Sequence, residues 1–384
     1  MRLSVQFDRP GFADGLYTLE ARGFVLGVLR WAGEKDVCPD WMSLGFITLD
    51  ALGNGSFRLE GGRSVPPGIT RVAADLISAD FDRRERVYFT LPADQLAQPM
   101  KQGTRFVLMS DLHLSRRTDR IRWALRRTRD ADCVLLAGDL TNDGLPEQFE
   151  LFQHCIEEEI PDVPVLAVTG NHDYPRMPVP LIETGIQSYP RFQSWLLERA
   201  RSMGVSCEES ESGAYAAVMG DVRILGLNAV THWRRFAFPE GRQLDWLEAE
   251  LRSGEYSRNI LLCHAPLAAH NPMQGGDGDV PYLARNRRLQ DIVDAAPGCV
   301  FVSGHTHLSM NEACGCVETD GDNVYINDSS IVTTMLRETP SPADREWLDS
   351  ALLRLNISGR SMELQTEGLR SRKFIARGYY RWEE

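Results

Sequence analysis

Residues 105–113 read RFVLMSDLH, an apolar, strand-like run that ends in Asp111, Leu112 and His113. At the end of an extended segment, residues two apart point to the same side, so the carboxylate of Asp111 and the imidazole of His113 can face one ion. A single pair of this kind is weak evidence, because a lone histidine is more often a satisfied core or surface residue. The pair gains weight only if other runs end in the same way.

Similar apolar runs recur along the chain, and segments of helical period separate them. The runs are DCVLLAG (132–138), VPVLAVTG (163–170), VRILGLN (222–228), NILLCHAP (259–266) and CVFVSG (299–304). The separating segments repeat apolar residues at intervals of three and four, and they are IRWALRRTRD (121–130), PEQFELFQHCIEEEI (146–160), YPRFQSWLLERARSM (189–203), RQLDWLEAELRSG (242–254) and RRLQDIVDAA (287–296). This alternation indicates an α/β layer architecture, because each amphipathic helix can cover a sheet face.

Most of these runs end in residues that can bind a metal ion. The run DCVLLAG is followed by Asp139, and VPVLAVTG is followed by Asn171-His172-Asp173. The run NILLC is followed by His264, and CVFVSG is followed by His305-Thr306-His307. The chain has eight histidines. Five of them stand at these strand ends, namely His113, His172, His264, His305 and His307. Because open α/β sheets bind ligands at the carboxyl ends of their strands, the sequence predicts one shared metal site.

Residues 104–335 resemble the calcineurin-like metallophosphoesterases. The blocks that carry the resemblance are Asp111-Leu112-His113, Gly138-Asp139, Gly170-Asn171-His172-Asp173, His264 and Gly304-His305-Thr306-His307. The resemblance implies one metal ion held by Asp111, His113 and His307, a second held by Asn171, His264 and His305, and Asp139 bridging the two. It also implies an α/β (α+β) sandwich of four layers, with two β-sheets flanked by helices.

The residue types at these positions suit the two divalent metal ions that the resemblance implies. Imidazole, carboxylate and amide oxygen suit Mn²⁺, Fe²⁺ or Zn²⁺, and the thiolates of a structural zinc site are missing from the blocks. The identity of the ions stays open. Two ions about 3.5–4 Å apart can clamp both oxygens of a phosphoryl displacement and hold a bridging hydroxide as the nucleophile. A site of this kind therefore predicts a metal-dependent phosphoric ester hydrolase.

His172 and Asp173 are the candidate catalytic residues beside the metal ligands. His172 follows a ligand without being one in the family pattern, so it can donate a proton to the leaving alkoxide or stabilise charge on phosphorus. Asp173 can hydrogen-bond to His172 and keep it cationic. The alternative for Asp173, of equal weight, is a structural role in capping the following turn.

Two other segments bear on the substrate. Asn142-Asp143-Gly144, followed by Pro146-Glu147, resembles the subgroup that includes bacterial cyclic-nucleotide and glycerophosphodiester phosphodiesterases. His232, Arg234 and Arg235 lie in a segment that resembles one passing near the pocket of such enzymes. In this segment the aromatic side chain of Trp233 can stack on a base, and the two arginines beside it can neutralise a phosphate. A solvent-facing loop is an equal alternative for these residues.

Residues 1–98 are predicted to form an accessory β-rich, sandwich-like domain. Alternating segments are separated there by Gly, Pro and Asp, and they include LSVQF (3–7), YTLEA (17–21), SLGFITL (43–49), SFRLE (56–60) and RVYFTL (86–91). A polar, Pro- and Gly-containing connection leads to the catalytic domain, residues 104–384, which includes a hairpin over 351–368. Nothing in residues 1–98 selects a role for them.

Composition restricts the partners of the chain. The 384 residues carry 42 basic and 54 acidic side chains, a net charge of −12 that argues against nucleic acid or an anionic membrane as partner. The start MRLSVQFDRPGF lacks the apolar core of a secretory signal, and no run reaches the length of a membrane span, so we expect a cytoplasmic protein. The oligomeric state stays open, with a homo-oligomer among the alternatives, as do the roles of Cys314 and Cys316.

The leading hypothesis is a metal-dependent phosphodiesterase that acts on a small soluble phosphodiester, with cyclic nucleotides as the first class to test. A phosphomonoesterase is the nearest alternative, because it needs the same metals. A non-catalytic scaffold is the alternative from another class, and it is disfavoured because all seven candidate ligands and His172 are present. The physiological substrate cannot be read from these motifs.

Overall fold

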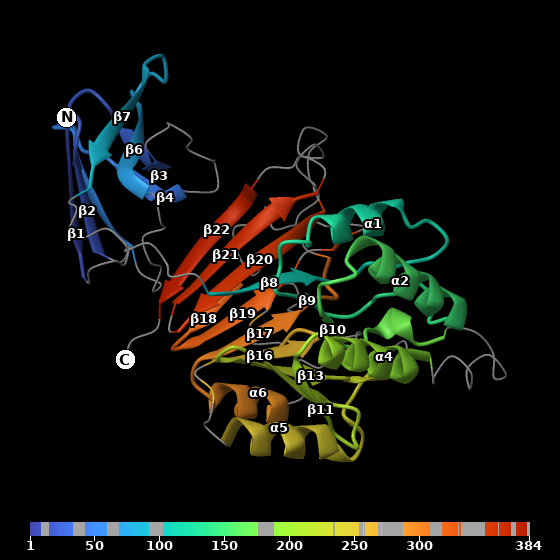
Figure 1. Cartoon of the computed structure of the whole chain (residues 1–384). Helices are drawn as coiled ribbons and strands as arrows, with labels where there is room; N and C mark the ends of the chain where they lie inside the picture. Colours follow the sequence, from blue (N-terminus) through green and yellow to red (C-terminus); the bar gives the residue numbers. More distant parts are fainter. Residues whose placement is uncertain are drawn as a thin grey trace. The chain divides into compact units, whose positions relative to one another are not determined.

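The structure is a computed structural model of the whole chain (Figure 1). It describes residues 1–8, 15–33, 43–59, 69–91, 103–175, 188–232, 235–252, 256, 258–267, 270, 287–307, 317–328, 330–331, 350–359, 361–369 and 374–381. The chain divides into two compact units, one of Met1–Gly103 with Ser361–Gln365 and Ile375–Glu384, the other of Thr104–Arg360 with Thr366–Phe374. The domain limits predicted from the sequence, 1–98 and 104–384, stay a prediction.

The amino-terminal unit is β-rich, as predicted, and its sheets are antiparallel. Its strands are β1 (Arg2–Phe7), β2 (Gly15–Glu20), β3 (Leu26–Gly33), β4 (Ser43–Thr48), β5 (Asn54–Leu59), β6 (Ile69–Ile77) and β7 (Arg84–Thr90). In the described residues β1-β2-β5 form one sheet and β4-β3-β6-β7 another, and one apolar core contains side chains of both. The sequence did not reveal β3 and β6. In β6 the consecutive buried residues Val72, Ala73 and Ala74 hide the alternation that marks a half-buried strand.

Two larger sheets are formed by strands from residue 104 onward. The first has the order β10-β9-β8-β20-β21-β22, with β8 (Thr104–Met109), β9 (Cys133–Leu136), β10 (Val165–Ala167), β20 (Ala351–Ser358), β21 (Ser361–Gly368) and β22 (Phe374–Arg381). The second has the order β11-β12-β13-β16-β17-β19-β18, with β11 (Ser206–Glu209), β12 (Tyr215–Met219), β13 (Val222–Leu227), β16 (Arg258–Cys263), β17 (Cys299–Ser303), β18 (Val317–Asp320) and β19 (Asn323–Asn327). Adjacent β20 and β21 confirm the predicted hairpin.

Helices cover the outer face of each of these sheets (Figure 1). Val107 and Met109 of β8 pack in a core with α1 (Asp119–Arg126), α2 (Pro146–Glu159) and α4 (Ser188–Ser202). Leu261 of β16 and Phe301 of β17 pack in a second core with α5 (Arg242–Arg252) and α6 (Arg287–Asp294). The opposite faces of the strands are buried too, as Leu108 of β8 and Ile260 of β16 show. The predicted four-layer arrangement of two sheets flanked by helices is confirmed.

Parallel strands bring the candidate ligands to one edge of each sheet. In the first sheet β8, β9 and β10 are parallel. In the second, β13, β16, β17 and β19 are parallel. Because parallel strands end at the same edge, the loops after them converge.

Among the described residues, none of the helices is long and apolar enough to span a membrane.

Candidate metal centre

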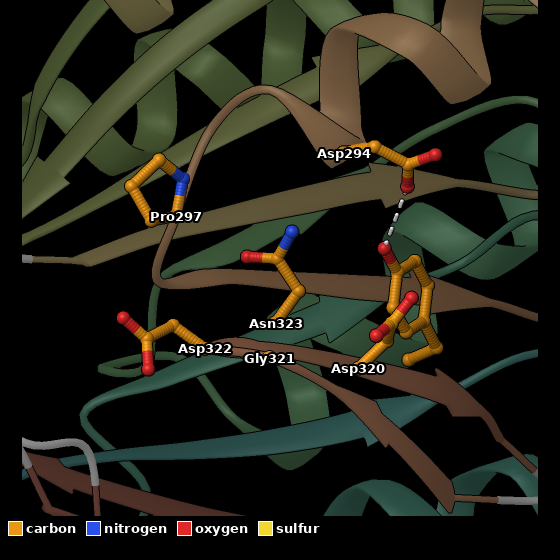
Figure 2. Close-up of a pocket in the computed structure, with 7 residues that line it drawn as sticks. Asp294, Pro297, Asp320, Gly321, Asp322 and Asn323 are labelled. Atoms are coloured by element: carbon orange, nitrogen blue, oxygen red, sulfur yellow. Dashed lines mark hydrogen bonds between the residues drawn. The ribbon is translucent and has the colours of Figure 1, made fainter.

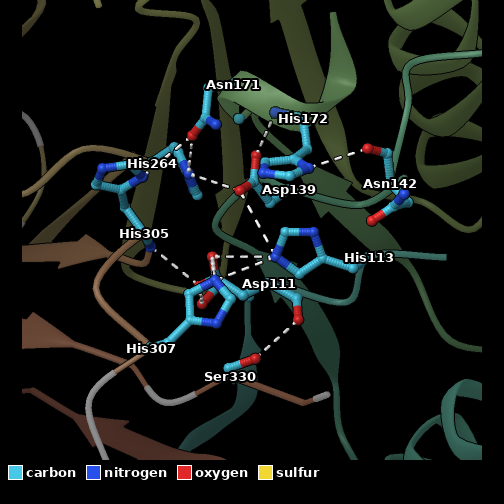
Figure 3. Close-up of polar contacts among 12 residues, drawn as sticks. Asp111, His113, Asp139, Asn142, Asn171, His172, His264, His305, His307 and Ser330 are labelled. Carbon is cyan, nitrogen blue, oxygen red and sulfur yellow. Dashed lines mark hydrogen bonds and ion pairs between the residues drawn. The ribbon is translucent and has the colours of Figure 1, made fainter. Parts of the chain in front are cut away.

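All seven candidate ligands lie in one cluster at these strand ends (Figure 3). Asp111, His113, Asp139 and His307 form one group, and Asp139, His264 and His305 form another, with the ligand atoms of each group within 4.8 Å of one another. Asn171 joins the second group, because its Oδ1 lies 3.1 Å from His305 Nδ1 and 3.3 Å from His264 Nε2. Two groups that share one carboxylate match the two ligand sets that the resemblance implies. The role of each residue as a ligand stays a prediction.

The first group presents its donor atoms to a common centre. His307 Nε2 lies 3.0 Å from Asp111 Oδ1 and 3.1 Å from His113 Nε2. Asp111 Oδ1 is buried and has no hydrogen-bond partner within the described part of the chain. A buried carboxylate oxygen without a hydrogen bond is costly, and two ring nitrogens that face each other both offer lone pairs in one tautomer. A divalent cation would satisfy all three atoms, so these residues fit a metal ion.

Asp139 lies between the two groups. Its Oδ2 is 3.8 Å from His113 Nε2 and 3.4 Å from His264 Nε2. Its Oδ1 accepts a hydrogen bond of 2.7 Å from the backbone N–H of His172. The His264 ring is fully buried and directs Nδ1 to the carbonyl of Ala137 at 2.7 Å. Since a carbonyl only accepts, His264 carries its hydrogen on Nδ1 and turns Nε2 toward the shared carboxylate.

The loops that carry the ligands adopt unusual backbone conformations. Seven non-glycine residues in the described ranges have positive φ, and five of them are candidate ligands: Asp111 (51°), His113 (44°), Asp139 (51°), His305 (73°) and His307 (55°). The left-handed region is unfavourable for residues with a Cβ and persists where the surrounding structure imposes it. Sharp turns directly after each strand therefore aim these side chains at the shared centre.

Two glycines make room for the cluster. Gly138 has φ +89°, and a Cβ there would lie 2.7 Å from the ring of His264. A Cβ on Gly170 would lie 2.2 Å from the backbone nitrogen of Asp139. Both approaches are closer than a side chain allows, so these loops touch because the residue before each ligand is glycine.

His172 and Asp173 occupy η3 (Asn171–Asp173), and the structure gives them different surroundings. The ring of His172 stands edge-on to that of His113, with centroids 4.4 Å apart, and its Nδ1 lies 2.9 Å from the carbonyl of Asn142. The buried carboxylate of Asp173 accepts hydrogen bonds from the backbone N–H groups of Leu140, Thr141 and Gly170, at 3.2, 2.8 and 2.8 Å, and from the Thr141 hydroxyl at 3.0 Å. These contacts favour the structural alternative for Asp173, and its catalytic role stays a prediction.

Charges within the cluster shift the pKa values of its members. Burial alone would raise the pKa of Asp139, yet the neighbouring imidazole of His264 lowers it to about 2. Burial alone would lower the pKa of His264, but Asp139 and Asp111 raise it to about 10. Burial lowers the pKa values of His113 and His305 to about 4. Ionised carboxylates and neutral imidazoles are the forms that bind metal ions, so three of these four shifts favour metal binding.

The predicted substrate contacts are only partly described. Arg234 lies outside the described residues, as do Cys314 and Cys316. His232 ends β14 (Val230–His232) and Arg235 begins β15 (Arg235–Phe236), but their side chains are not described. Phe236, which sequence reasoning missed, packs edge-on against His305 with ring centroids 4.8 Å apart. The segment that carries the predicted contacts therefore adjoins the cluster.

Residues at the end of β19 and just after it brace the ligand loops, and sequence reasoning missed them as well. Asn327 Nδ2 donates to the carbonyl of Gly304 at 2.7 Å, and the hydroxyl of Ser330 donates to the carbonyl of Asp111 at 3.0 Å. The signal was present, because the apolar VYI of 324–326 is followed by Asn-Asp-Ser-Ser. It was overlooked because that run ends without a histidine.

A separate cavity of about 400 Å³ lies at the opposite edge of the second sheet (Figure 2). It is lined by Asp294, Pro297, Asp320, Gly321, Asp322, Asn323 and Tyr325, which lie near the starts of β17 and β19 rather than their carboxyl ends. The Tyr325 hydroxyl donates to Asp294 Oδ1 at 3.1 Å. None of these residues belongs to the ligand cluster, so we assign the chemistry to the cluster.

Comparisons with known proteins agree with this assignment. Two curated relatives are named as probable phosphodiesterases. A "Probable cyclic nucleotide phosphodiesterase" of Synechococcus sp. is 28% identical over 191 residues, 49% of this chain and 63% of the relative. A "Probable glycerophosphodiester phosphodiesterase GpdQ" of Arcobacter nitrofigilis is 25% identical over 182 residues, 46% of this chain and 56% of the relative. The chain thus spans less than two thirds of the length of either relative.

Among solved structures, the purple acid phosphatase PPD1 from yellow lupin (Lupinus luteus) seeds is similar with a TM-score of 0.49 and 12% identity, covering 99% of this chain and 74% of that one. The family model described as "Calcineurin-like phosphoesterase" matches residues 104–309. That match covers more than half of the sequence and contains all seven candidate ligands. The chain therefore belongs to the calcineurin-like phosphoesterase family.

Proposed function

We propose that this protein is a dinuclear metal-dependent phosphodiesterase that hydrolyses a small soluble phosphodiester, with cyclic nucleotides as the first class to test. The observation that carries the proposal is the carboxylate of Asp139, which stands 3.8 Å from a nitrogen of one ligand group and 3.4 Å from a nitrogen of the other. A carboxylate shared in this way suits two adjacent ions. The names of both curated relatives support the diester over the monoester.

The chain's own residues would hold the two ions in separate sets. Asp111, His113 and His307 would hold one ion, Asn171, His264 and His305 the other, and Asp139 would bind both. When bound, Mn²⁺, Fe²⁺ or Zn²⁺ would neutralise charge on the phosphoryl group and supply a strong nucleophile at neutral pH. Five of these seven residues stand in sharp turns with positive φ, which fix the direction of their side chains.

His172 is the proposed donor of the proton that the leaving group needs. Because the carbonyl of Asn142 only accepts, the Nδ1 atom of His172 must carry a hydrogen. The proton that this ring can exchange is therefore the one on Nε2. The contact between the rings of His172 and His113 places this group beside the first ligand set. We assign to His172 the delivery of a proton to the departing alkoxide oxygen.

Substrate selection would fall to the segment after β13. Phe236 packs against the rings of His305 and His264, with centroids 4.8 and 5.8 Å away, and Arg235 directly precedes it. An arginine in this segment would suit the phosphate of a diester, and an aromatic residue there would suit a base. We therefore keep His232, Arg234 and Arg235 as the proposed substrate contacts.

A leaving-group comparison tests the proposal. The His172→Ala variant should lose about 10²- to 10⁴-fold in kcat on a 3′,5′-cyclic nucleotide, whose leaving group is an alkoxide. It should lose far less on bis(p-nitrophenyl) phosphate, because p-nitrophenolate leaves without a proton. Equal losses on both substrates would contradict the role of His172. A higher kcat/KM for a nucleoside monophosphate than for the matched cyclic diester would instead identify a phosphomonoesterase.

A further inference from the structure

Asp328 is a buried carboxyl beside the ligand cluster that the proposed mechanism does not use. It follows directly after β19, whose carboxyl end pairs with that of β17 through Ser303 and Asn327. The side chain is 0% exposed, and it lies beyond the residues that match the family model. A fully buried acid must be neutral or well paired, because burying an unpaired charge is costly.

The hydroxyl of Ser110 joins Asp328 to the candidate ligand Asp111. Ser110 Oγ lies 2.5 Å from Asp111 Oδ2, and it also bonds to Asp328 Oδ1. A hydroxyl has one hydrogen and can donate only once. Two carboxylate oxygens at hydrogen-bond distance from one hydroxyl therefore require a second hydrogen, which one of the carboxyl groups must supply.

The surroundings of the two carboxyl groups decide which one holds that hydrogen. Asp111 Oδ2 also accepts from the backbone N–H of His305 at 3.0 Å, and its Oδ1 faces His307 Nε2 at 3.0 Å. These neighbours suit an ionised group. Asp328 Oδ2, like Asp111 Oδ1, has no hydrogen-bond partner within the ranges that the structure describes, but unlike Asp111 Oδ1 it has no imidazole within ion-pair distance there. A charged oxygen in that position would be unpaired and buried, whereas the carbonyl oxygen of a neutral acid costs much less.

We propose that Asp328 is a positioning residue held as the neutral acid: it donates to Ser110, and Ser110 donates to Asp111. This relay uses the Oδ2 atom of Asp111 and leaves Oδ1 turned toward His113 and His307. The proposal depends on the proposed function only in taking Asp111 as a metal ligand. Burial also raises the pKa of Asp328 well above its ordinary value, in agreement with the geometry.

The same segment also fixes the backbone at this point. Ser330 forms a β-bridge with Ser110 and donates through its hydroxyl to the carbonyl of Asp111 at 3.0 Å. The backbone N–H of Ile331 donates to the carbonyl of Ser110 at 3.3 Å. Asp328, Ser330 and Ile331 therefore hold both the main chain and the side chain around the first ligand, and Asp328 acts on the side chain.

Infrared spectroscopy tests the protonation state directly. The spectrum of the wild type at neutral pH should contain the C=O stretch of a protonated carboxyl group that is lost in Asp328→Asn. The matched control Asp320→Asn changes an exposed carboxyl on the same hairpin and should leave that band in place. A band that is unchanged in Asp328→Asn, or no difference between the two variants, would overturn the neutral acid. This measurement requires neither substrate nor turnover.

Zinc affinity, measured by competition with a chromogenic chelator, tests the positioning role. Asp328→Asn keeps a donor for Ser110 and should bind Zn²⁺ within about threefold of the wild type. Asp328→Leu and Ser110→Ala break the relay and should each weaken Zn²⁺ binding by about 10- to 100-fold, the usual effect of losing a group that orients a metal ligand. The double variant should be no weaker than either single variant.

Wild-type affinity in folded Ser110→Ala would overturn the positioning role, and it does so even if Asp328→Leu does not fold. A protein that binds Zn²⁺ with these dependences but hydrolyses no phosphoester would contradict the proposed function and leave the role of Asp328 intact. The two failures can therefore be told apart.

Discussion

Replacing Asp173 by alanine should destabilise the larger unit, because this carboxylate joins two ligand loops. It accepts the N–H groups of Leu140 and Thr141, which follow Asp139, and the N–H of Gly170, which precedes Asn171. The side chain is 1% exposed, so water does not replace it freely. Its removal leaves three backbone donors without an acceptor and separates the shared ligand from its neighbour.

The size of the effect follows from these donors. Each buried N–H left without a partner costs about 1–3 kcal/mol, and partial relaxation brings the total for Asp173→Ala to roughly 3–5 kcal/mol. A domain of this size loses about 3 °C in Tm per kcal/mol, so we expect a fall of about 9–15 °C. Zinc affinity should fall by about 10- to 100-fold as well, because the loops of Asp139 and Asn171 are no longer held together.

Thermal unfolding of the metal-stripped protein, followed by circular dichroism, measures the first effect, and chelator competition measures the second. Asp162→Ala, which removes an exposed aspartate from the connection before β10, is the control and should unfold within about 1–2 °C of the wild type. If Asp173 acts only through His172, Asp173→Ala will unfold at the same temperature as the control, and only its activity will fall. That result would refute the structural role.

Two further predictions concern single contacts. Gly170→Ala should weaken Zn²⁺ binding at least tenfold in the same chelator competition, because its Cβ would lie 2.2 Å from the backbone nitrogen of Asp139. The control is Gly321→Ala, whose Cβ would meet nothing within 4 Å, and it should bind Zn²⁺ as the wild type does. Because burial raises the pKa of Asp328, the unfolded chain releases that proton above about pH 4 while the folded chain keeps it. The free energy of unfolding of the wild type relative to Asp328→Asn should therefore fall by up to about 1.4 kcal/mol per pH unit as the pH rises from 4 toward 7. Urea unfolding of both proteins across this pH range measures the difference. Parallel pH profiles of the two unfolding free energies would contradict the prediction.

Much of the catalytic fold was predictable, because its strands are short apolar runs and its helices are amphipathic. Parallel strands that end at one edge made it possible to group Asp139, His264 and His305 from their positions after apolar runs, although they lie far apart in the sequence. The resemblance then divided the ligands into two sets. The structure places them in the same two groups.

The bracing residues were not predictable in the same way. The bond between Ser110 and Asp328 joins positions 218 residues apart, and no local pattern of charge or hydropathy indicates such a pair. Likewise, the sequence shows only that a carboxylate, Asp173, follows His172. Whether it turns toward that imidazole or toward the backbone of Leu140 and Thr141 depends on how the loop after β9 approaches, which is set by tertiary packing.

The strands of the amino-terminal unit show a different limit. Segments with strict alternation, such as β1 and β5, are recognisable because one face is more exposed than the other. β3 lies between β4 and β6, and its burial alternates from Gly27 to Trp31, but its sequence LGVLRWAG has apolar residues on both faces. Where both faces of a strand carry apolar residues, the alternation of apolar and polar residues that marks a half-buried strand is lost from the sequence.

Hydrolysis of bis(p-nitrophenyl) phosphate beside p-nitrophenyl phosphate, by metal-stripped protein reloaded in turn with Mn²⁺, Fe²⁺ and Zn²⁺, tests the central claim most directly. We expect activity to return with at least one ion at two ions per chain, to favour the diester, and to vanish in Asp139→Ala, since that carboxylate lies between both ligand groups. Full activity at one ion per chain, unchanged activity in Asp139→Ala, or no cleavage with any ion would contradict a dinuclear phosphodiesterase.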